Sequence, residues 1–557
     1  MQPILSDSCL CYRLRVNQSK ANAVGEISRR AFVGAGMAVA VGFPAIRPSR
    51  ETDLVIRGGT VFDGTGTEGR EADVAISGDR ITDIRKHIPD SGKDEIDARG
   101  LAVSPGFIDI HSHGDGNMFA DPRVESVIRQ GVTTMVVGAD GDSRADGGAK
   151  SFADLFASID KLKPGPNVAS MVGFGSVREA VVGNDNRPAS APELARMVAM
   201  VDRAVLDGAC GGSTGLEYTP GAFAPLDELI ALARPLASRR LPYATHMRNE
   251  DDRLIEAIDE AIAVARGAGC PLQISHLKTQ GPTNWSKLDQ VFLLISAARG
   301  ARTDVAFDRY PYVAYATGLT NLFPVWSRDG GVDRFLGRVA DSATADRIRA
   351  ETLAKVDLIG GWDNVQVSGV KAVEDRDAEG KRLGAYAKSR NLDPYAATVE
   401  LLRRSSGDVG MLGYAMSEAN LARILSHPLG MVCSDGGGFA IDGPTRRGSP
   451  HPRGAGTFPR VLARYVREKK VLTLAQAINK MTALPASRIR LSDRGRLERG
   501  MSADVVVFDP ASVEDKATFE MPFQYPLGIN AVVVNGVVAL RDGQRSNIGS
   551  GRSLRPS

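Results

Sequence analysis

The sequence predicts an α/β protein built on a (β/α)8 barrel of the TIM type, with a small β-sandwich and an inserted subdomain. Three observations lead to this fold class. Eight β-like runs alternate with helical stretches through the middle of the chain, which is the pattern of parallel βα units. Short strand-like runs separated by Gly-rich and Asp-Gly turns occur at both ends of the chain. One gap between β-like runs, residues 309–429, is far longer than one helix requires.

The composition is that of a globular protein with more than one structural unit. The chain has 557 residues, of which 43% are hydrophobic and 24% charged, so neither disorder nor a membrane bundle is indicated. Residues 1–50 carry seven Lys or Arg and two Asp or Glu, and the rest of the chain is nearly neutral. A near-neutral body offers no electrostatic reason to expect a nucleic-acid partner. The five cysteines have no Cys-x-x-Cys spacing, which argues against a disulfide framework and leaves a single bridge open.

Residues 1–50 are predicted to be an export signal. The pair Arg29 and Arg30 precedes a mild apolar run rich in Gly and Ala, which resembles a twin-arginine signal. The run is too short and too rich in small residues for a transmembrane helix, so no stable membrane insertion is expected after the signal is removed. The expected partner during export is the twin-arginine translocase, and the expected destination is the periplasm. The alternative is a plain amphiphilic terminus.

The two ends of the remaining chain are predicted to fold together as one β-sandwich domain of residues 51–104 and 482–557. Near the first end, strand-like runs are separated by turns such as Gly58-Gly59 and Asp63-Gly64. Near the second end, a similar alternation surrounds the turn Asn535-Gly536. The expected strands of this domain are residues 53–57, 60–62, 72–76, 81–84, 503–509 and 531–540.

Residues 105–481 are predicted to form the barrel. Its eight expected strands are residues 107–111, 133–138, 167–174, 209–216, 242–247, 271–277, 302–308 and 430–435. Helical runs at residues 343–356 and 394–405 indicate that the long gap, about 309–429, is an inserted subdomain before the last strand. Because barrel active sites and their lids lie at the carboxyl ends of the strands, the insertion is expected to cover that face.

Four of the seven histidines follow predicted barrel strands directly. His111 and His113 stand two residues apart at the end of the first strand, where alternate side chains point to the same face. His246 ends the fifth strand and His276 ends the sixth. This placement is poorly explained by chance and favours a common site.

Two carboxylates stand at corresponding positions. Asp140 follows the second predicted strand and Asp435 follows the eighth. Since all these strand ends ring one mouth of a closed barrel, the four imidazoles and the two carboxylates are expected to converge there. Such a set of nitrogen and oxygen ligands suits Zn²⁺, or the related ions Co²⁺ and Mn²⁺.

With these residues in place, the sequence resembles the amidohydrolase superfamily and, within it, the N-acyl-D-amino-acid deacylases or D-aminoacylases. The resemblance covers nearly all of residues 53–545. It rests on the segments 105–113 (PGFIDIHSH), 131–134 (GVTT), 213–216 (STGL), 275–278 (SHLK), 310–312 (YPY), 434–436 (SDG), 451–453 (HPR), 456–460 (GTFPR) and 500–504 (GMSAD). Together these segments are specific, although each alone is modest evidence.

The resemblance implies roles for the residues at the strand ends. It implies that His111, His113, His246 and His276 hold the metal and that Asp435 is a ligand and also the general base. A bound metal lowers the pKa of water, and the base would take the proton and pass it to the leaving nitrogen.

The resemblance also implies that Lys278, Tyr310 and Arg453 hold the carboxylate of the substrate. Arg suits that role because its planar fork binds a carboxylate at two points. His451 is expected to orient Arg453. The alternative for Lys278 and Arg453 is that they are ordinary salt-bridge residues.

One position departs from the family pattern. The family often has a metal-ligating Cys in an Asn-Cys-Gly turn after the second strand, and Ala139-Asp140-Gly141 takes its place here. Asp140 is therefore predicted to be a harder, carboxylate ligand that bridges the site, with one or two divalent ions per chain. The alternative is that Asp140 accepts hydrogen bonds within a turn. Cys210 and Cys433 are predicted to be buried small side chains rather than ligands.

The function expected from the sequence is metal-dependent hydrolysis of the amide bond of an N-acyl-amino acid, with the D configuration favoured. The products would be a carboxylic acid and a free amino acid. A second hypothesis keeps this chemistry and changes the substrate to a dipeptide, a cyclic amide or another carboxylate-bearing amide. A third hypothesis is a barrel that binds a metal or an acyl ligand without turnover. It is suggested by the absence of the Cys that the family often has after the second strand.

Overall fold

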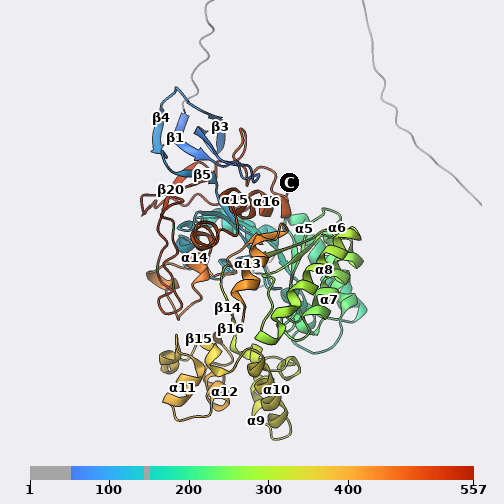
Figure 1. Cartoon of the computed structure of the whole chain (residues 1–557). Helices are drawn as coiled ribbons and strands as arrows, with labels where there is room; N and C mark the ends of the chain where they lie inside the picture. Colours follow the sequence, from blue (N-terminus) through green and yellow to red (C-terminus); the bar gives the residue numbers. More distant parts are fainter. Residues whose placement is uncertain (1–51, 144–150) are drawn as a thin grey trace, which may run out of the picture. The chain divides into compact units, whose positions relative to one another are not determined.

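The computed structural model describes residues 52–143 and 151–557. The predicted export signal of residues 1–50 lies outside the described residues. The described part has a mixed α/β fold in which short strands alternate with helices along the middle of the chain (Figure 1). In this part of the chain, no helix combines the length and the apolar character that crossing a membrane requires.

Nine strands between residues 107 and 432 are all parallel to their neighbours. They form a three-stranded sheet, β6-β7-β8, and a six-stranded sheet, β9-β10-β11-β12-β13-β17. Their bounds are β6 Phe107–Asp109, β7 Val132–Val137, β8 Asn167–Ser170, β9 Val172–Gly173, β10 Gly212–Gly215, β11 Tyr243–His246, β12 Leu272–Ile274, β13 Val305–Arg309 and β17 Gly430–Val432. Each expected barrel strand overlaps at least one of these strands.

Contacts at both ends connect the two sheets. Strands β8 and β9 are separated by the single residue Met171, so one sheet continues into the other. After β17, the amide of Asp435 donates a hydrogen bond to the carbonyl of His111 at 2.8 Å. The amide of His113 donates in turn to the carbonyl of Gly436 at 2.9 Å. The segment after the last strand is therefore bonded to the segment after the first.

Several parallel strands end earlier than the sequence predicts. Strand β12 ends at Ile274 and β17 ends at Val432, each three residues before the expected end. The residues that follow include His276, Asp435 and, after β7, Asp140, with φ of 36°, 50° and 53°. Few residues other than Gly adopt this left-handed conformation, and an extended strand cannot continue through it. The chain therefore turns at these three residues.

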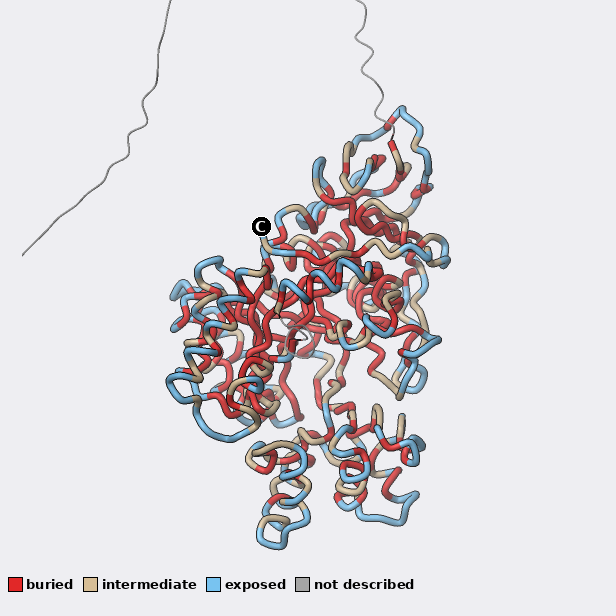
Figure 2. The backbone as a smooth tube through the Cα atoms, turned by 180° about the vertical axis from the view of Figure 1, so that it is seen from behind, coloured by how far each residue is buried: buried red, intermediate tan, exposed pale blue. Residues whose placement is uncertain are grey.

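Helices between the parallel strands bury one face and expose the other. The longest is α5 (Ala191–Asp207), where Ser190 and Glu193 form a capping box that satisfies the first amides. Helix α7 (Leu254–Ala268) buries Ile258, Ala261 and Ala265 and exposes the side opposite them. Figure 2 shows the same division, with buried residues in the interior strands and exposed residues on the outer turns. Burial of this apolar face is what holds each helix against the strands.

The two ends of the described chain share one mixed sheet of nine strands, with antiparallel and parallel pairs. The strands are β1 Thr52–Val61, β2 Arg70–Ser77, β3 Arg80–Arg85, β4 Gly92–Asp97, β5 Ala102–Pro105, β18 Val505–Phe508, β19 Ile529–Val534, β20 Val537–Arg541 and β21 Gln544–Arg545. Strand β5 pairs antiparallel with β18 and thereby joins the two ends. Their apolar side chains, among them Ile56, Val74 and Val505, share one core. Hydrogen bonds link all nine strands into one sheet, and this pairing by itself does not define two packed layers. The arrangement as a sandwich therefore stays a prediction.

The segment between β13 and β17 has a sheet of its own. Strand β16 (Val409–Tyr414) pairs antiparallel with both β14 (Ala314–Gly318) and β15 (Val365–Val370). The helices of this segment are α9 Val332–Ala340, α10 Ala345–Leu358, α11 Leu383–Ser389 and α12 Pro394–Arg404. Helix α13 (Glu418–Ser426) then leads back to β17.

Candidate metal centre

Six side chains from five different strand ends meet in one place. His111 and His113 follow β6, Asp140 follows β7, His246 is the last residue of β11, His276 follows β12 and Asp435 follows β17. Four of the six are buried, and the side chains of Asp140 and His113 are 9% and 40% exposed. The six residues that the sequence analysis proposed as ligands are therefore brought together.

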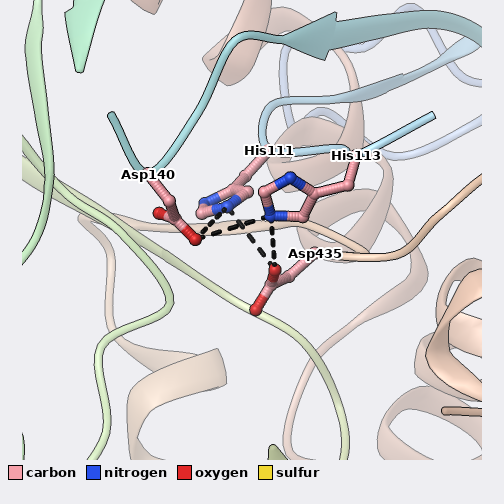
Figure 3. Close-up of side chains that lie close together, drawn as sticks. All are labelled: His111, His113, Asp140 and Asp435. Carbon is pink, nitrogen blue, oxygen red and sulfur yellow. Dashed lines mark ion pairs between the residues drawn. The ribbon is translucent and has the colours of Figure 1, made fainter. Parts of the chain in front are cut away.

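The first group of ligand atoms surrounds one point (Figure 3). Nε2 of His111 lies 3.4 Å from Oδ2 of Asp140 and 3.5 Å from Oδ1 of Asp435. Nε2 of His113 lies 3.5 Å from the same Asp140 oxygen and 3.1 Å from the same Asp435 oxygen. All four atoms lie within 4.8 Å of one another.

A second group shares the same oxygen of Asp140. Oδ2 lies 3.5 Å from Nε2 of His276 and 3.8 Å from Nδ1 of His246. The two imidazole nitrogens are 3.1 Å apart. One carboxylate oxygen thus faces a nitrogen from each of the four histidines, and it is the only atom that both groups have in common.

These separations fit cation ligands better than they fit direct hydrogen bonds. Two atoms bound about 2.1 Å from one tetrahedral zinc ion are about 3.4 Å apart, whereas a charge-assisted hydrogen bond is about 2.8 Å long. Among the described residues, the buried Nε2 of His111 and Oδ1 of Asp140 have no hydrogen-bond partner. Polar atoms are rarely left so, and a cation beside Nε2 of His111 would satisfy that nitrogen.

Left-handed turns aim the two carboxylates at the centre. The turn before Asp140 contains Gly138, whose φ is 73° and where a Cβ would lie 2.2 Å from the carbonyl oxygen of Met171. Any larger residue at Gly138 would displace backbone. The turn after Asp140 is held by Ser213, which accepts a hydrogen bond from the amide of Gly141 at 3.1 Å. Asp140 is thus presented by a rigid loop between β7 and β10.

A further set of carboxylates contacts the outer nitrogens of the imidazoles. Oδ1 of Asp308 lies 3.5 Å from Nδ1 of His111, and Oε1 of Glu250 lies 3.1 Å from Nδ1 of His276. Oε2 of Glu217 lies 3.4 Å from Nε2 of His246. Such contacts fix the orientation and tautomer of a metal-binding imidazole.

These three acids were not among the site residues predicted from the sequence. The one available signal was position, since Asp308 and Glu217 also lie at strand ends and Glu250 is four residues after His246.

The local electrostatics favour positive charge at the centre. Burial lowers the pKa of His113, but hydrogen bonds with Asp140 and Asp435 outweigh it and raise that pKa to about 9. For Asp140, burial raises the pKa, but the charge of His111 and its neighbours outweighs burial and holds the Asp140 pKa well below its ordinary value. The carboxylates are therefore anionic and stabilise any cation placed among them.

Asp435 is held between the histidines and an arginine. Its Oδ1 faces His113, and its Oδ2 lies 2.7 Å from Nη1 of Arg453. Burial would raise the pKa of Asp435, but Arg453 and the nearby histidines outweigh it and keep the carboxylate ionised. His451 accepts a hydrogen bond from the Arg453 amide at 3.0 Å and so contacts the backbone of that residue rather than its guanidinium.

The other two proposed substrate residues line the same cavity. Nζ of Lys278 lies 2.6 Å from Oε1 of Glu250 and 2.5 Å from Nδ1 of His276. The hydroxyl of Tyr310 is buried and has no hydrogen-bond partner. The guanidinium of Arg453 stands 4.6 Å from the centre of the Tyr310 ring. The cavity has a volume of about 490 Å³ and also contains the centre formed by Asp140, His246 and His276.

The three cysteines in the described part of the chain take no part in the centre. Cys210, Cys270 and Cys433 are free and buried among apolar neighbours. Burial raises the pKa of Cys210 to about 12, so its thiol stays neutral. His427 packs against Phe292 with ring centres 4.7 Å apart and lies outside the centre.

Comparisons with known proteins identify relatives of this chain. A family model described as "Amidohydrolase family" matches residues 438–540. The chain is 35% identical to a D-aminoacylase of Alcaligenes xylosoxydans xylosoxydans over 524 residues, which are 91% of this chain and 98% of that protein. It is 37% identical to an N-acyl-D-glutamate deacylase of the same organism over 501 residues, 87% of this chain and 93% of that one.

A solved structure gives the same result. The crystal structure of N-acyl-D-glutamate deacylase from Bordetella bronchiseptica, in complex with zinc and a phosphonate inhibitor that mimics the tetrahedral intermediate, has a TM-score of 0.78 and 34% identity. The match covers 91% of this chain and 100% of that chain. The resemblance seen in the sequence motifs is thereby confirmed, and the chain belongs to the family of D-aminoacylases and N-acyl-D-amino-acid deacylases within the amidohydrolases.

Proposed function

We propose that this protein hydrolyses the amide bond of N-acyl-D-amino acids and releases a carboxylic acid and a free amino acid. The observation that carries this proposal is the single Asp140 oxygen shared by four imidazoles, beside Asp435 and inside a cavity with Lys278 and Arg453. The named activities of the relatives, a D-aminoacylase and an N-acyl-D-glutamate deacylase, support it.

The residues present fit one or two zinc ions. His111, His113 and Asp435 would hold one ion, His246 and His276 would hold another, and Asp140 would contribute to both. Bound zinc supplies Lewis-acid polarisation of a carbonyl and lowers the pKa of water. The zinc in the related crystal structure supports this choice of ion, and Co²⁺ or Mn²⁺ would suit the same ligands.

Asp435 is the proposed general base. It is ionised and anchored through one oxygen by Arg453, which leaves the oxygen facing His113 to accept a proton from the attacking water. Asp435 then passes that proton to the amide nitrogen as the carbon–nitrogen bond breaks, so that the amine leaves neutral. The buried surroundings keep bulk water from competing for the proton.

Three side chains are proposed to hold the substrate carboxylate. The unpartnered hydroxyl of Tyr310 can donate to it directly. Arg453 and Lys278 supply positive charge from the neighbouring strand ends, although each also contacts a carboxylate of the protein, Asp435 and Glu250. The substrate carboxylate would share the donors that these two contacts leave free.

Three features of the fold are proposed together with the function: a closed barrel, an inserted subdomain and one domain made from both chain ends. The parallel order of β6 to β17, together with the hydrogen bonds between the segments after β17 and β6, supports a closed (β/α)8 barrel. The separate sheet β14-β16-β15 supports an inserted subdomain, and Tyr315 to Gly318 from its first strand line the cavity. The pairing of β5 with β18 supports one domain made from both chain ends.

A substrate panel tests the proposed function. Zinc-loaded protein is expected to hydrolyse N-acetyl-D-amino acids, and the corresponding carboxamides, which lack the anionic anchor, are expected to react about 100-fold more slowly in kcat/KM. Removal of metal by a chelator should abolish activity, and zinc should restore it. Absence of turnover by metal-loaded protein across D- and L-acyl amino acids, with a ligand still bound, would instead favour a binding protein without catalysis.

Export through the twin-arginine translocase to the periplasm is a separate proposal. It rests on Arg29 and Arg30 and the apolar run that follows them. In a Gram-negative host, the full chain is expected in the periplasmic fraction, and a chain with Lys at both arginine positions is expected to stay in the cytoplasm. Equal periplasmic amounts of the two chains would contradict this proposal.

A further inference from the structure

The cavity around the metal centre is unusually polar. Among the described residues, none that line it is Leu, Ile, Val, Met, Phe or Trp. Its aromatic lining consists of Tyr218, Tyr310 and Tyr315, and several glycines leave backbone rather than side chains at the surface. A pocket for a long acyl chain or a large apolar side chain would carry apolar lining. The variable part of the substrate is therefore expected to be small and polar.

The basic and the acidic side chains that line the cavity come from different strand ends. The two basic side chains, Lys278 and Arg453, belong to the segments after β12 and β17. Four acidic side chains besides the proposed ligands line the cavity: Glu250 pairs with Lys278, and the other three, Asp142, Glu179 and Glu217, belong to the segments after β7, β9 and β10. We call these three residues the acidic wall. In the strand order of the two sheets, β11 separates β10 from β12, so the acidic wall and Lys278 come from strand ends that are not adjacent.

Within residues 52–143 and 151–557, two of the three carboxylates of the acidic wall have no cationic partner. Glu179 accepts a hydrogen bond from Asn184 at 3.3 Å, and Asp142 accepts one from Ser176 at 3.0 Å. In the described part of the chain, neither carboxylate has a Lys or Arg nitrogen within 4.0 Å. Both are exposed to solvent, and each lines the cavity.

Glu217 is only partly compensated. Its carboxylate lies 3.4 Å from His246 and 3.9 Å from Nζ of Lys355, which also pairs with Asp251. The guanidinium of Arg328 donates to the backbone carbonyl of Glu217 rather than to its side chain. Among the described residues, the acidic wall therefore retains net negative charge.

We propose that the acidic wall binds a cationic group of the substrate, so that the enzyme prefers amides with a carboxylate at one end and a positive charge at the other. This inference rests on the proposed function, because it specifies the substrate of the same site. The cation can come from two sources. It can be the ammonium of an aminoacyl group, which makes the substrate a dipeptide with a D residue at its carboxyl end, or the side chain of a basic D-amino acid.

The placement of the residues favours the aminoacyl source. The scissile amide has to lie at the metal centre, with its nitrogen side directed to the basic residues that hold the carboxylate. The acyl side then extends away from Lys278 and Arg453, toward the segments after β7, β9 and β10. Opposite charge at this position lowers the free energy of the bound cation, and an anionic acyl group would be repelled.

The test compares isosteric substrates on the zinc-loaded enzyme. Glycyl-D-alanine and propionyl-D-alanine differ by the replacement of one ammonium with a methyl group, and succinyl-D-alanine adds a negative charge. At about pH 7, where the ammonium is mostly charged, kcat/KM for the glycyl compound is expected to exceed that for the propionyl compound by about 10-fold. The succinyl compound should be the poorest. Raising the salt from about 0.05 M to about 0.5 M should reduce the glycyl preference, because it screens exposed charges.

Two variants identify the acidic wall as the cause. Glu179→Gln should lower the glycyl-to-propionyl ratio, and Glu179→Lys should shift the preference toward the succinyl compound. Glu256→Gln removes one exposed carboxylate from α7, outside the cavity, and should leave the ratio unchanged. A second arm compares Nα-acetyl-D-lysine with N-acetyl-D-norleucine, and a preference confined to this arm assigns the cation to the side chain.

The outcomes separate the two proposals. Hydrolysis of the propionyl or succinyl compound as fast as, or faster than, the glycyl compound, with no preference in the lysine arm, would overturn the acidic-wall inference and leave amide hydrolysis intact. A cation preference that Glu179→Lys does not change would also overturn it. Failure to hydrolyse any of the five compounds would contradict the proposed function itself.

Discussion

Asp435→Asn is expected to lower kcat for the best substrate by about 10³-fold, which is the order of magnitude attributed to general acid–base catalysis. Asn has nearly the same shape as Asp but cannot take a proton from water and return it to the leaving nitrogen. The residue keeps one oxygen that can face His113, so metal content per chain should change little. The measurement combines steady-state kinetics with elemental analysis of the same preparation.

Asp442→Asn provides a control for this variant. Asp442 is exposed and lies in the same segment after β17, seven residues from Asp435, where it pairs with Arg123. Its substitution should leave kcat near the wild-type value. If Asp435→Asn also retains near wild-type kcat, the general base is another group and the assignment is wrong.

Asp140→Ala is expected to have the second large effect, on metal content. If the shared oxygen of Asp140 completes both groups of ligands, wild-type protein should hold about two ions per chain and the variant one or none. Activity should fall by about 100-fold or more, since loss of only an outer contact already costs about 10- to 100-fold. Metal analysis after gel filtration and kinetics with added zinc measure the two effects.

Asp140→Cys distinguishes the loss of a ligand from damage to the turn. A thiolate at this position is the ligand that the family often uses, and it should retain metal where Ala does not. Asp140→Ala with one ion per chain, equal to wild type, would mean that the site is mononuclear and that Asp140 is a turn residue. Loss of metal from both variants would indicate that the turn requires the carboxylate.

The convergence of the proposed ligands was predictable because a parallel arrangement of strands converts sequence position into spatial position. His111, His246, His276 and Asp435 are far apart in the chain, yet each follows a parallel strand, and parallel strands end at one edge. The pattern of short β-like runs was therefore enough to bring them together. The two-residue spacing of His111 and His113 added a second proposed ligand after the same strand.

The details of the backbone at those ends were not predictable in the same way. Asp140, His276 and Asp435 have left-handed φ values that local propensity disfavours in residues other than Gly. Contacts with other strands maintain them, as the hydrogen bond from the Asp435 amide to His111 illustrates. The prediction from the sequence extended the strands through these residues because their side chains alone give no sign of the turn.

The sequence by itself determined the α/β class, the order of the strands and the identity of the proposed metal ligands, because these depend on periodicity and on residue type along the chain. Tertiary structure alone decided which carboxylates orient the imidazoles, that Arg453 contacts Asp435, and that acidic residues after β7, β9 and β10 share a cavity with Lys278. The physical reason is that each of these contacts joins side chains from different strands. Their distances depend on packing across the sheets, which no local pattern in the sequence encodes.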